Sequence, residues 1–317
     1  MSFESFMRAA LFDPQHGYYS RQILTVGAKG DFATATTLSS TLARAIGDWV
    51  MTQHRTKNLP LNLIEIGAGD GSLARHLLKS LPLWTRLKCK YHIVETSAPL
   101  RQQQAKRLSR KVRWFDSPKD ALTSCGGEAI IFHNELVDAF PVRRFEKKEE
   151  GWEECWIELG SQGKREYTCP SSPLPASSAF DQGYQTGQRI EVLESYQTWL
   201  KEWLPDWKRG EMLTIDYGDP IERLYHRRPK GTLRAYLFHQ TLSGMDIYQN
   251  PGRQDMTSDV NFTDLANWGN SLGLQNAPLQ TQADFIRKFA SDSLEDQYLL
   301  DESGPGKEFK VLHQSKR

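Results

Sequence analysis

The sequence predicts an α/β protein built on a doubly wound sheet of roughly seven strands. Apolar runs of strand length recur along the chain and alternate with segments of helical periodicity in its first half. Several of these runs end in carboxylates, as expected at the carboxyl-end edge of an open parallel sheet. We expect a single domain over 1–317, with an N-terminal helical cap or lid at 1–55 and insertions on the substrate side at 143–190 and 220–256.

The first elements follow from the spacing of apolar side chains. Residues 2–12 and 38–54 carry apolar residues three and four positions apart, which is the spacing of one helix face. Residues 61–66 form a nearly continuous apolar run, typical of a buried parallel strand, and helical spacing returns at 72–81. The remaining strands expected in the sheet are 87–94, 112–115, 129–133, 212–215, 274–281 and 308–313.

The intervening segments are expected to be helices, turns and inserted structure. Residues 143–159 alternate in polarity, which predicts a β-hairpin around 149–151. Residues 164–187 are rich in Ser, Pro and Gly and predict a long loop or flap. Asn261 or Thr263 is a candidate N-cap of a late helix. Further helices are expected at 97–111, 188–203, 259–272 and 282–289.

Composition and charge exclude several classes of protein. The chain of 317 residues has 40 Lys and Arg against 39 Asp and Glu, a formal net charge of +1, so no broad basic field for nucleic acid is expected. Its four cysteines are scattered without a Cys-x-x-Cys pair, and no metal site is predicted. No apolar run reaches membrane-spanning length. The N-terminus lacks the pattern of a signal or transit peptide, so a cytoplasmic location is expected.

The first predicted strand ends in a carboxylate and three closely spaced glycines, Glu65-x-Gly67-x-Gly69-x-Gly71. Glycines after a buried strand let the backbone turn tightly and approach a ligand, and the amides that begin the next helix point at it. A dinucleotide fold would need a further glycine at position 72, where Ser72 stands. The pattern instead resembles the first motif of class I S-adenosylmethionine (SAM) methyltransferases. A glycine-rich turn without any ligand is the alternative.

Further cofactor contacts are predicted in three other segments. Glu95 follows the glycine turn by 24 residues and ends the second strand, where an acid can accept hydrogen bonds from ribose hydroxyls or, alternatively, cap the next helix. Asp116 lies in the turn after the third strand, where this fold commonly holds the adenine. Gly30, Asp31 and Phe32 belong to a loop of small residues that can lie against a ligand or simply connect two elements.

A polar loop with two acids leaves the fourth strand at Asn134. Glu135 and Asp138 are three residues apart, so they would share one face of a helical turn. A loop at this edge of the sheet predicts a functional role for them, with simple capping as the alternative. Asp216 supplies another carboxylate at the end of the fifth strand.

Several short segments of the sequence, taken together, resemble motifs of the MidA-like family of class I SAM-dependent methyltransferases. They follow the family's order over nearly the whole chain. The mitochondrial members of that family are assembly factors that methylate an arginine on a subunit of respiratory complex I. The matching segments are Asp13-Pro14-Gln15-His16-Gly17-Tyr18-Tyr19-Ser20, Gly30-Asp31-Phe32-Ala33-Thr34-Ala35, the glycine motif, Asn134-Glu135-Leu136-Val137-Asp138-Ala139-Phe140-Pro141-Val142, Asp216-Tyr217-Gly218, Gly231-Thr232-Leu233-Arg234-Ala235-Tyr236 and Asp259-Val260-Asn261-Phe262.

The resemblance implies direct in-line transfer of a methyl group from SAM to an arginine side chain of a protein. An arginine is always protonated, so carboxylates must offset its charge beside the cationic sulfonium and orient the guanidinium. Glu135 and Asp138 are the first candidates and Asp216 the third, with Asn134 beside the reacting centre and the cofactor. The cofactor-binding residues would be Gly30, Asp31, Phe32, Glu65, Gly67, Gly69, Gly71, Glu95, Asp116 and Asn134.

Two other functions remain open at this point. A non-catalytic SAM-binding assembly or scaffold protein would keep the same fold, and the inserted segments suit a protein-sized partner in either case. A nicotinamide-dependent oxidoreductase is disfavoured by Ser72. The expected partner is a protein acceptor, for which the resemblance implies a subunit of a respiratory complex, with no nucleic acid and no membrane insertion. The sequence leaves the oligomeric state open, a homodimer included.

Overall fold

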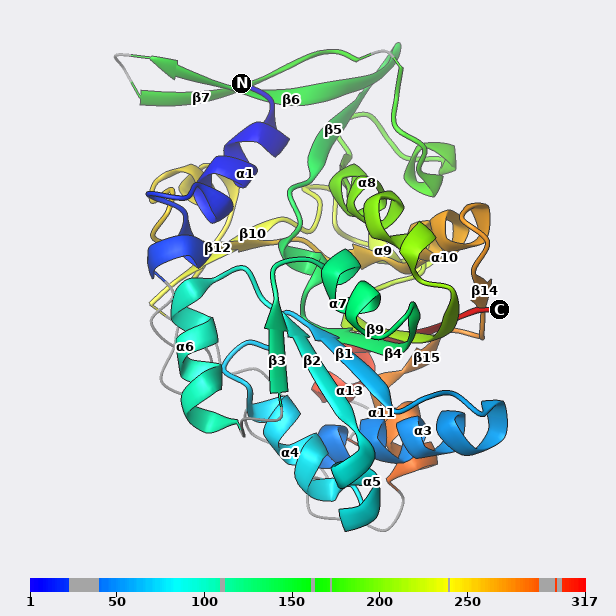
Figure 1. Cartoon of the computed structure of the whole chain (residues 1–317). Helices are drawn as coiled ribbons and strands as arrows, with labels where there is room; N and C mark the ends of the chain where they lie inside the picture. Colours follow the sequence, from blue (N-terminus) through cyan, green and yellow to red (C-terminus); the bar gives the residue numbers. More distant parts are fainter. Residues whose placement is uncertain are drawn as a thin grey trace. The chain divides into compact units, whose positions relative to one another are not determined.

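The computed structural model describes residues 1–22, 40–108, 112–160, 163–171, 173–238, 240–290, 300 and 304–317. Its elements are labelled along the chain in Figure 1. The chain divides into two compact units. Unit 1 comprises Met1–Gln22, Val137–Leu200 and Gly218–Asn267, and unit 2 comprises Ile23–Leu136, Lys201–Tyr217 and Trp268–Arg317. The expectation of a single domain with a cap at 1–55 stays a prediction.

Unit 2 is organised around a sheet whose main path has the strand order β14-β16-β9-β4-β1-β2-β3 (Figure 1). The five strands from β9 to β3 are parallel, whereas β16 and β14 run antiparallel to their neighbours. The strands are β1 (Asn62–Ile66), β2 (Lys90–Val94), β3 (Val112–Phe115), β4 (Glu128–Asn134), β9 (Arg209–Asp219), β14 (Gln275–Asn276) and β16 (Phe309–Lys316). The predicted doubly wound α/β sheet is confirmed.

The strand order places β1 between β2 and β4. The chain therefore leaves β1 toward one side of the sheet and later returns to its other side. In open α/β sheets this reversal opens a crevice at the carboxyl ends of the strands, and ligands bind there. The glycine turn after β1 and the polar loop after β4 both leave the sheet at this edge.

One face of the sheet in unit 2 carries a continuous apolar core. Every second residue of the parallel strands points into it, among them Leu63, Ile93, Ile130 and Phe132. The helices α3 (Thr41–Lys57), α4 (Ser72–Ser80) and α11 (Gln282–Phe289) cover these side chains. Trp49 of α3 is 1% exposed. The other helical segments of unit 2 are α5 (Leu83–Lys88), α6 (Ala98–Arg107), α7 (Pro118–Ser124), η4 (Leu204–Asp206) and α13 (Pro305–Glu308).

Unit 1 contains two smaller antiparallel sheets. One has the order β7-β6-β5-β8, formed by β5 (Arg143–Lys148), β6 (Gly151–Gly160), β7 (Gly163–Pro170) and β8 (Arg189–Val192). The other has the order β11-β10-β12, formed by β10 (Arg234–Leu237), β11 (Gln240–Leu242) and β12 (Asp255–Thr257). Two residues of β13 (Val260–Asn261) pair with the last two residues of β9.

The helical segments of unit 1 are mostly short. The predicted N-terminal helix is α1 (Phe3–Phe12), which buries its apolar face. Asn261 accepts hydrogen bonds from the backbone amides of Thr263 and Asp264, so it caps α10 (Phe262–Ser271) as predicted. The others are η1 (Tyr18–Gln22), η2 (Val137–Ala139), η3 (Ser178–Asp181), α8 (Glu194–Trp203), α9 (Ile221–Leu224) and η5 (Gly244–Tyr248).

Four predicted elements differ from the structure. The expected strand at 87–94 begins only at Lys90, because Leu87 and Lys88 end the helix α5. The expected loop at 164–187 begins instead with β7, because this strand pairs antiparallel with β6 over its whole length. The expected helix at 188–203 is the strand β8 followed by α8, since Ile190 pairs with Phe145 of β5. The expected strand at 274–281 is reduced to β14 and β15 (Gln280–Thr281), which pair with β16. In the described part of the chain, no helix has the length and apolar character needed to cross a bilayer.

Candidate active site

The turn after β1 has the backbone that its glycines predict. Gly67, Gly69 and Gly71 have φ values of 70°, 52° and 79°, in the left-handed region where a side chain is disfavoured. The Gly67 amide donates to the carbonyl of Val94, which ties the turn to the end of β2. A Cβ on Gly67 would lie 2.8 Å from Cδ1 of Leu136. The turn thus needs glycine both for its backbone and for the close approach of the loop after β4.

Glu65 is the last acid of β1 and is only 2% exposed. Its Oε2 accepts a hydrogen bond from the Tyr91 hydroxyl at 2.6 Å. Burial raises the pKa of Glu65 to about 7, although the Tyr91 hydrogen bond opposes this, and the charge of Glu95 adds to the increase. The side chain therefore sits inside the sheet edge beneath the glycine turn. Its predicted contact with the cofactor stays a prediction.

Glu95 follows β2 and is joined to the glycine turn through Gln104 of α6. The Gln104 amide group donates to the carbonyl of Gly69 at 2.8 Å and to Oε2 of Glu95 at 3.0 Å. The indole of Trp114 donates to the same glutamine. The other oxygen of Glu95 accepts the backbone amide of Ser97, the N-cap residue of α6, and so fixes the chain just before this helix without capping it. Burial raises the pKa of Glu95. This local hydrogen bond and a ribose contact through Oε2 are compatible in this geometry.

Asp116 follows β3 and is exposed, with its Oδ1 accepting from Arg101 at 2.8 Å. Arg101 also donates to the carbonyls of Glu95 and Phe115, so it links the ends of β2 and β3. The predicted lid residues Gly30, Asp31 and Phe32 lie outside the described residues. Their role stays a prediction.

The loop after β4 is fixed by Asp216 of β9. Asp216 is 0% exposed. Its Oδ2 accepts the backbone amide of Leu136 at 3.1 Å and its Oδ1 that of Tyr217 at 3.0 Å. The Glu135 amide donates to the carbonyl of Ile215, and Glu135 has a φ of 51°. Both oxygens of Asp216 thus have backbone partners, which indicates that this carboxylate holds the loop in place.

Asn134 and Glu135 lie side by side at the carboxyl end of β4. The Asn134 amide group donates to Oε1 of Glu135 at 3.0 Å. Oδ1 of Asn134 is buried and has no hydrogen-bond partner in the described part of the chain. Burying an amide oxygen without a partner is unfavourable. A donor group of a ligand at this edge of the sheet would satisfy it.

Asp138 lies in η2, within unit 1, and is 5% exposed. The predicted helical face shared with Glu135 is wrong, because the helical turn begins only at Val137 and Glu135 has a left-handed backbone. The Tyr19 hydroxyl donates to Oδ1 of Asp255 at 2.9 Å. Burial, then the charges of Asp255 and Asp138, raise the pKa of Tyr19. Unit 1 therefore gathers two aspartates around one tyrosine.

Two parts of this arrangement were missed in the sequence. Gln104 is a polar residue in line with Leu100 and Leu108 on α6, and a buried polar side chain within an apolar stripe is the signal that could have identified it. The pair of Tyr19 and Asp255 is separated by 236 residues, and no local pattern could have joined it.

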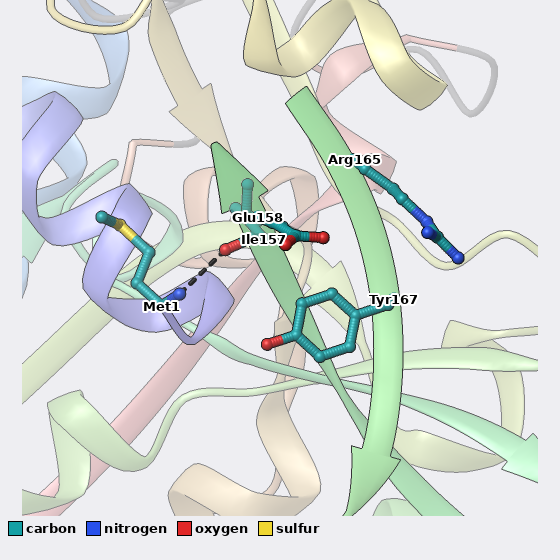
Figure 2. Close-up of a pocket in the computed structure, with 5 residues that line it drawn as sticks. All are labelled: Met1, Ile157, Glu158, Arg165 and Tyr167. Atoms are coloured by element: carbon teal, nitrogen blue, oxygen red, sulfur yellow. Dashed lines mark hydrogen bonds between the residues drawn. The ribbon is translucent and has the colours of Figure 1, made fainter. Parts of the chain in front are cut away.

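A surface pocket of about 570 Å³ lies on the β6–β7 hairpin of unit 1 (Figure 2). It is lined by Met1, Ile157, Glu158, Arg165 and Tyr167. The N-terminal amine donates to the carbonyl of Ile157 at 2.8 Å. None of the predicted site residues lines this pocket. Among the described residues, no group of three or more His, Cys, Asp and Glu side chains has the arrangement of a metal site.

The residues of unit 2 fit the cofactor that the sequence predicts. The glycines of the turn have no side chains, so a ligand can approach their backbone closely. Oδ1 of Asn134 has no hydrogen-bond partner among the described residues, so a ligand could donate to it. Fold and site together define a class I SAM-dependent methyltransferase. The chain belongs to the family described as putative S-adenosyl-L-methionine-dependent methyltransferases, whose model matches residues 41–279. This supports the predicted MidA-like family and SAM as the cofactor.

Solved structures show the same fold. The chain is 26% identical to a superfamily member described as a methyltransferase, from Burkholderia thailandensis, whose crystal structure contains S-adenosylhomocysteine. The TM-score is 0.84, and the match covers 100% of this chain and 88% of that one. A second structure from the same organism has a TM-score of 0.82 at 25% identity, covering 100% and 87% of the two chains.

Relatives of this chain are named as protein arginine methyltransferases of mitochondria, which bears on the expected cytoplasmic location. The chain is 26% identical to the mitochondrial protein arginine methyltransferase NDUFAF7 of Danio rerio, over 99% of this chain and 78% of that protein. It is 25% identical to the protein of the same name from Homo sapiens, over 90% of this chain and 69% of that protein. The expected cytoplasmic location is wrong on this comparison, because these relatives are named as mitochondrial proteins.

Proposed function

We propose that this methyltransferase transfers a methyl group to an arginine side chain of a protein. Relatives that cover nearly the whole chain are named protein arginine methyltransferases. The observation in the structure that carries the proposal is the placement of Glu135. This acid directly follows β4 and offers a carboxylate where the chain leaves the cofactor edge of the sheet.

The charge of the acceptor explains why acids are needed. SAM, when bound, supplies an electrophilic methyl group on a cationic sulfonium. A guanidinium keeps its proton at any ordinary pH, so two like charges must be brought together. Glu135 accepts a hydrogen bond from the Asn134 amide group through Oε1, which holds its carboxylate at the carboxyl end of β4, where a guanidinium N–H could donate to it. Bidentate pairing with carboxylates would offset the repulsion and orient one nitrogen toward the methyl group.

Asp216 takes a different role in this proposal from the one the sequence predicted. Because both of its oxygens accept backbone amides, we assign it to positioning and not to acceptor binding. It would hold Leu136 against Gly67 and thereby fix Asn134 and Glu135 relative to the glycine turn. Within unit 1, Asp138 and Asp255 lie around Tyr19, and we propose that this acidic group of unit 1 takes part in acceptor binding.

The acceptor itself is the finer part of the proposal. The resemblance to assembly factors that act on respiratory complex I leads us to propose a subunit of a respiratory complex as the acceptor. The inserted strands β5 to β8 and β10 to β12 of unit 1 add surface that suits a protein better than a small molecule.

The proposal is tested by transfer of a labelled methyl group from SAM to proteins of a source-cell lysate. The parent protein should label a small number of bands, whereas Glu135→Gln should bind SAM normally by calorimetry and label none. If the parent binds SAM but labels neither a protein nor a small molecule, the chain is a SAM-binding scaffold protein and not an enzyme. Loss of SAM binding in Glu135→Gln would instead make Glu135 a cofactor ligand.

A further inference from the structure

The short helix α5 presents three large apolar side chains to solvent. Leu83, Trp84 and Leu87 are 57%, 76% and 50% exposed, and the helix buries none of its residues. Leu87 lies four positions after Leu83 and three after Trp84, so it neighbours both on the helix surface. Among the large apolar side chains of the described residues, Phe238 alone, at 77%, is more exposed than Trp84. A cluster of this kind on a protein surface marks a contact with something apolar.

The sequence immediately before and after α5 carries charge of one sign. Residues 71–94 contain five Lys and Arg and no Asp or Glu. Within the described part of the chain, none of these five forms an ion pair. Four of them are exposed and one, Arg86, is half-buried. The five are Arg75, Lys79, Arg86, Lys88 and Lys90. The apolar cluster is therefore flanked in the sequence by five positive charges.

This surface lies away from the cofactor turn within unit 2. The helix α5 leads directly into the first residue of β2, and Lys90 pairs with Asn62 at the start of β1 (Figure 1). The glycine turn leaves the opposite, carboxyl end of the same strand β1. Anything bound at α5 would therefore leave the carboxyl-end edge of the sheet uncovered.

We propose that α5 and its basic neighbours dock this protein on the surface of an anionic phospholipid membrane. Tryptophan and leucine side chains favour the boundary between headgroups and acyl chains, and lysine and arginine are attracted to anionic headgroups. Binding of this type lies on the membrane and needs no spanning helix. The proposal is independent of the identity of the methyl acceptor.

Other occupants explain the two observations less well. A second copy docking through the same face would bring five positive charges against five. A nucleic acid would neutralise the basic residues but would leave Leu83 and Leu87 exposed to phosphate and water. An acidic protein surface would match the charge, and the experiment below separates it from a lipid surface.

The test is co-sedimentation of the full chain with lipid vesicles. The parent should bind vesicles containing about one third phosphatidylglycerol, and should bind pure phosphatidylcholine vesicles at least tenfold more weakly. Raising the salt concentration should weaken binding, because exposed charges are screened. Trp84→Ser should weaken binding about tenfold, with an unchanged melting temperature because α5 buries no residue.

Matched variants separate this surface from general stickiness. Phe238→Ser removes an equally exposed aromatic, 77% against 76%, from unit 1 and should leave vesicle binding unchanged. Lys88→Gln combined with Lys90→Gln should lower binding to anionic vesicles and leave the weaker binding to pure phosphatidylcholine vesicles unchanged. The proposal is overturned if the parent does not bind anionic vesicles, or if Trp84→Ser binds like the parent. It is also overturned if poly-L-glutamate binds in a Trp84-dependent way while vesicles do not.

Discussion

Replacing Gly67 with alanine tests whether the glycine turn and the loop after β4 form one cofactor site. Gly67 has a φ of 70°, which costs an L-residue about 1–2 kcal/mol. The new Cβ would also lie 2.8 Å from Cδ1 of Leu136, well inside the ordinary carbon–carbon contact of about 3.5–4.0 Å. Leu136 must therefore shift by roughly 1 Å, against the hydrogen bond from its amide to Asp216.

Gly126→Ala is the matched control for this change. Gly126 has a φ of 71°, and a Cβ there would meet nothing within 4 Å. Both variants should lose about 1–2 kcal/mol of stability from the backbone alone. Only Gly67→Ala should also displace the loop, and we expect its affinity for SAM to fall about tenfold, equivalent to about 1.4 kcal/mol.

The assay is titration calorimetry of SAM binding beside thermal unfolding of both variants. A loss of SAM affinity confined to Gly67→Ala, with a loss of stability at least as large as that of Gly126→Ala, would support the site. The reasoning is refuted if Gly67→Ala binds SAM as tightly as the parent. It is equally refuted if Gly126→Ala loses as much affinity, since that would trace the effect to general destabilisation.

Three further changes test individual side chains. In Asp216→Asn the new side-chain N–H group would face one of the two backbone amides that now donate to the carboxylate. The change should cost about 1–3 kcal/mol of stability and weaken both SAM binding and methyl transfer. Unchanged SAM affinity would contradict a positioning role for Asp216. Glu65 has a pKa of about 7 in the folded protein and an ordinary value of 4.5. Because the folded state holds this proton more tightly, the free energy of unfolding should fall as pH rises from 4.5 to 7, by about 3 kcal/mol at most. Glu65→Gln should flatten that part of a melting-temperature profile, and a parent profile without the fall would contradict the burial argument. Tyr19→Phe removes the hydrogen bond to Asp255 and should lower the rate of methyl transfer roughly tenfold at unchanged SAM affinity. Tyr248→Phe removes a similar hydrogen bond to Glu166 and should lower stability alone. If the two variants transfer methyl groups at the same rate, Tyr19 has no role in acceptor binding.

Most of the fold could be predicted because its signals are local. The strands of unit 2 are short apolar runs with clear boundaries, and helices such as α11 have apolar side chains at regular spacing. The stretch 188–203 shows where this fails. Ile190, Leu193 and Leu200 fit the spacing of one helix face, but Ile190 pairs with Phe145 in a strand. Pairing with a distant strand decided the local structure, and periodicity does not contain that information.

The parts of the site that could be predicted are those in which the residue type itself requires the local structure. The glycines could be identified because their backbone angles are required by the turn itself. The role of Asp216 could not, because a carboxylate at a strand end looks the same whether it faces a ligand or two backbone amides. The helical face expected for Glu135 and Asp138 failed for a similar reason, since a positive φ at a glutamate leaves no mark in the sequence.

Arginine methylation of a protein is the central claim, and mapping the labelled residue tests it most directly. The band labelled by SAM in a lysate would be digested and its modified peptide sequenced by mass spectrometry. We expect the added methyl group on an arginine side chain, and no such peptide with Glu135→Gln. A methyl group on lysine, or label found only in small molecules, would contradict the claim and leave the SAM site intact.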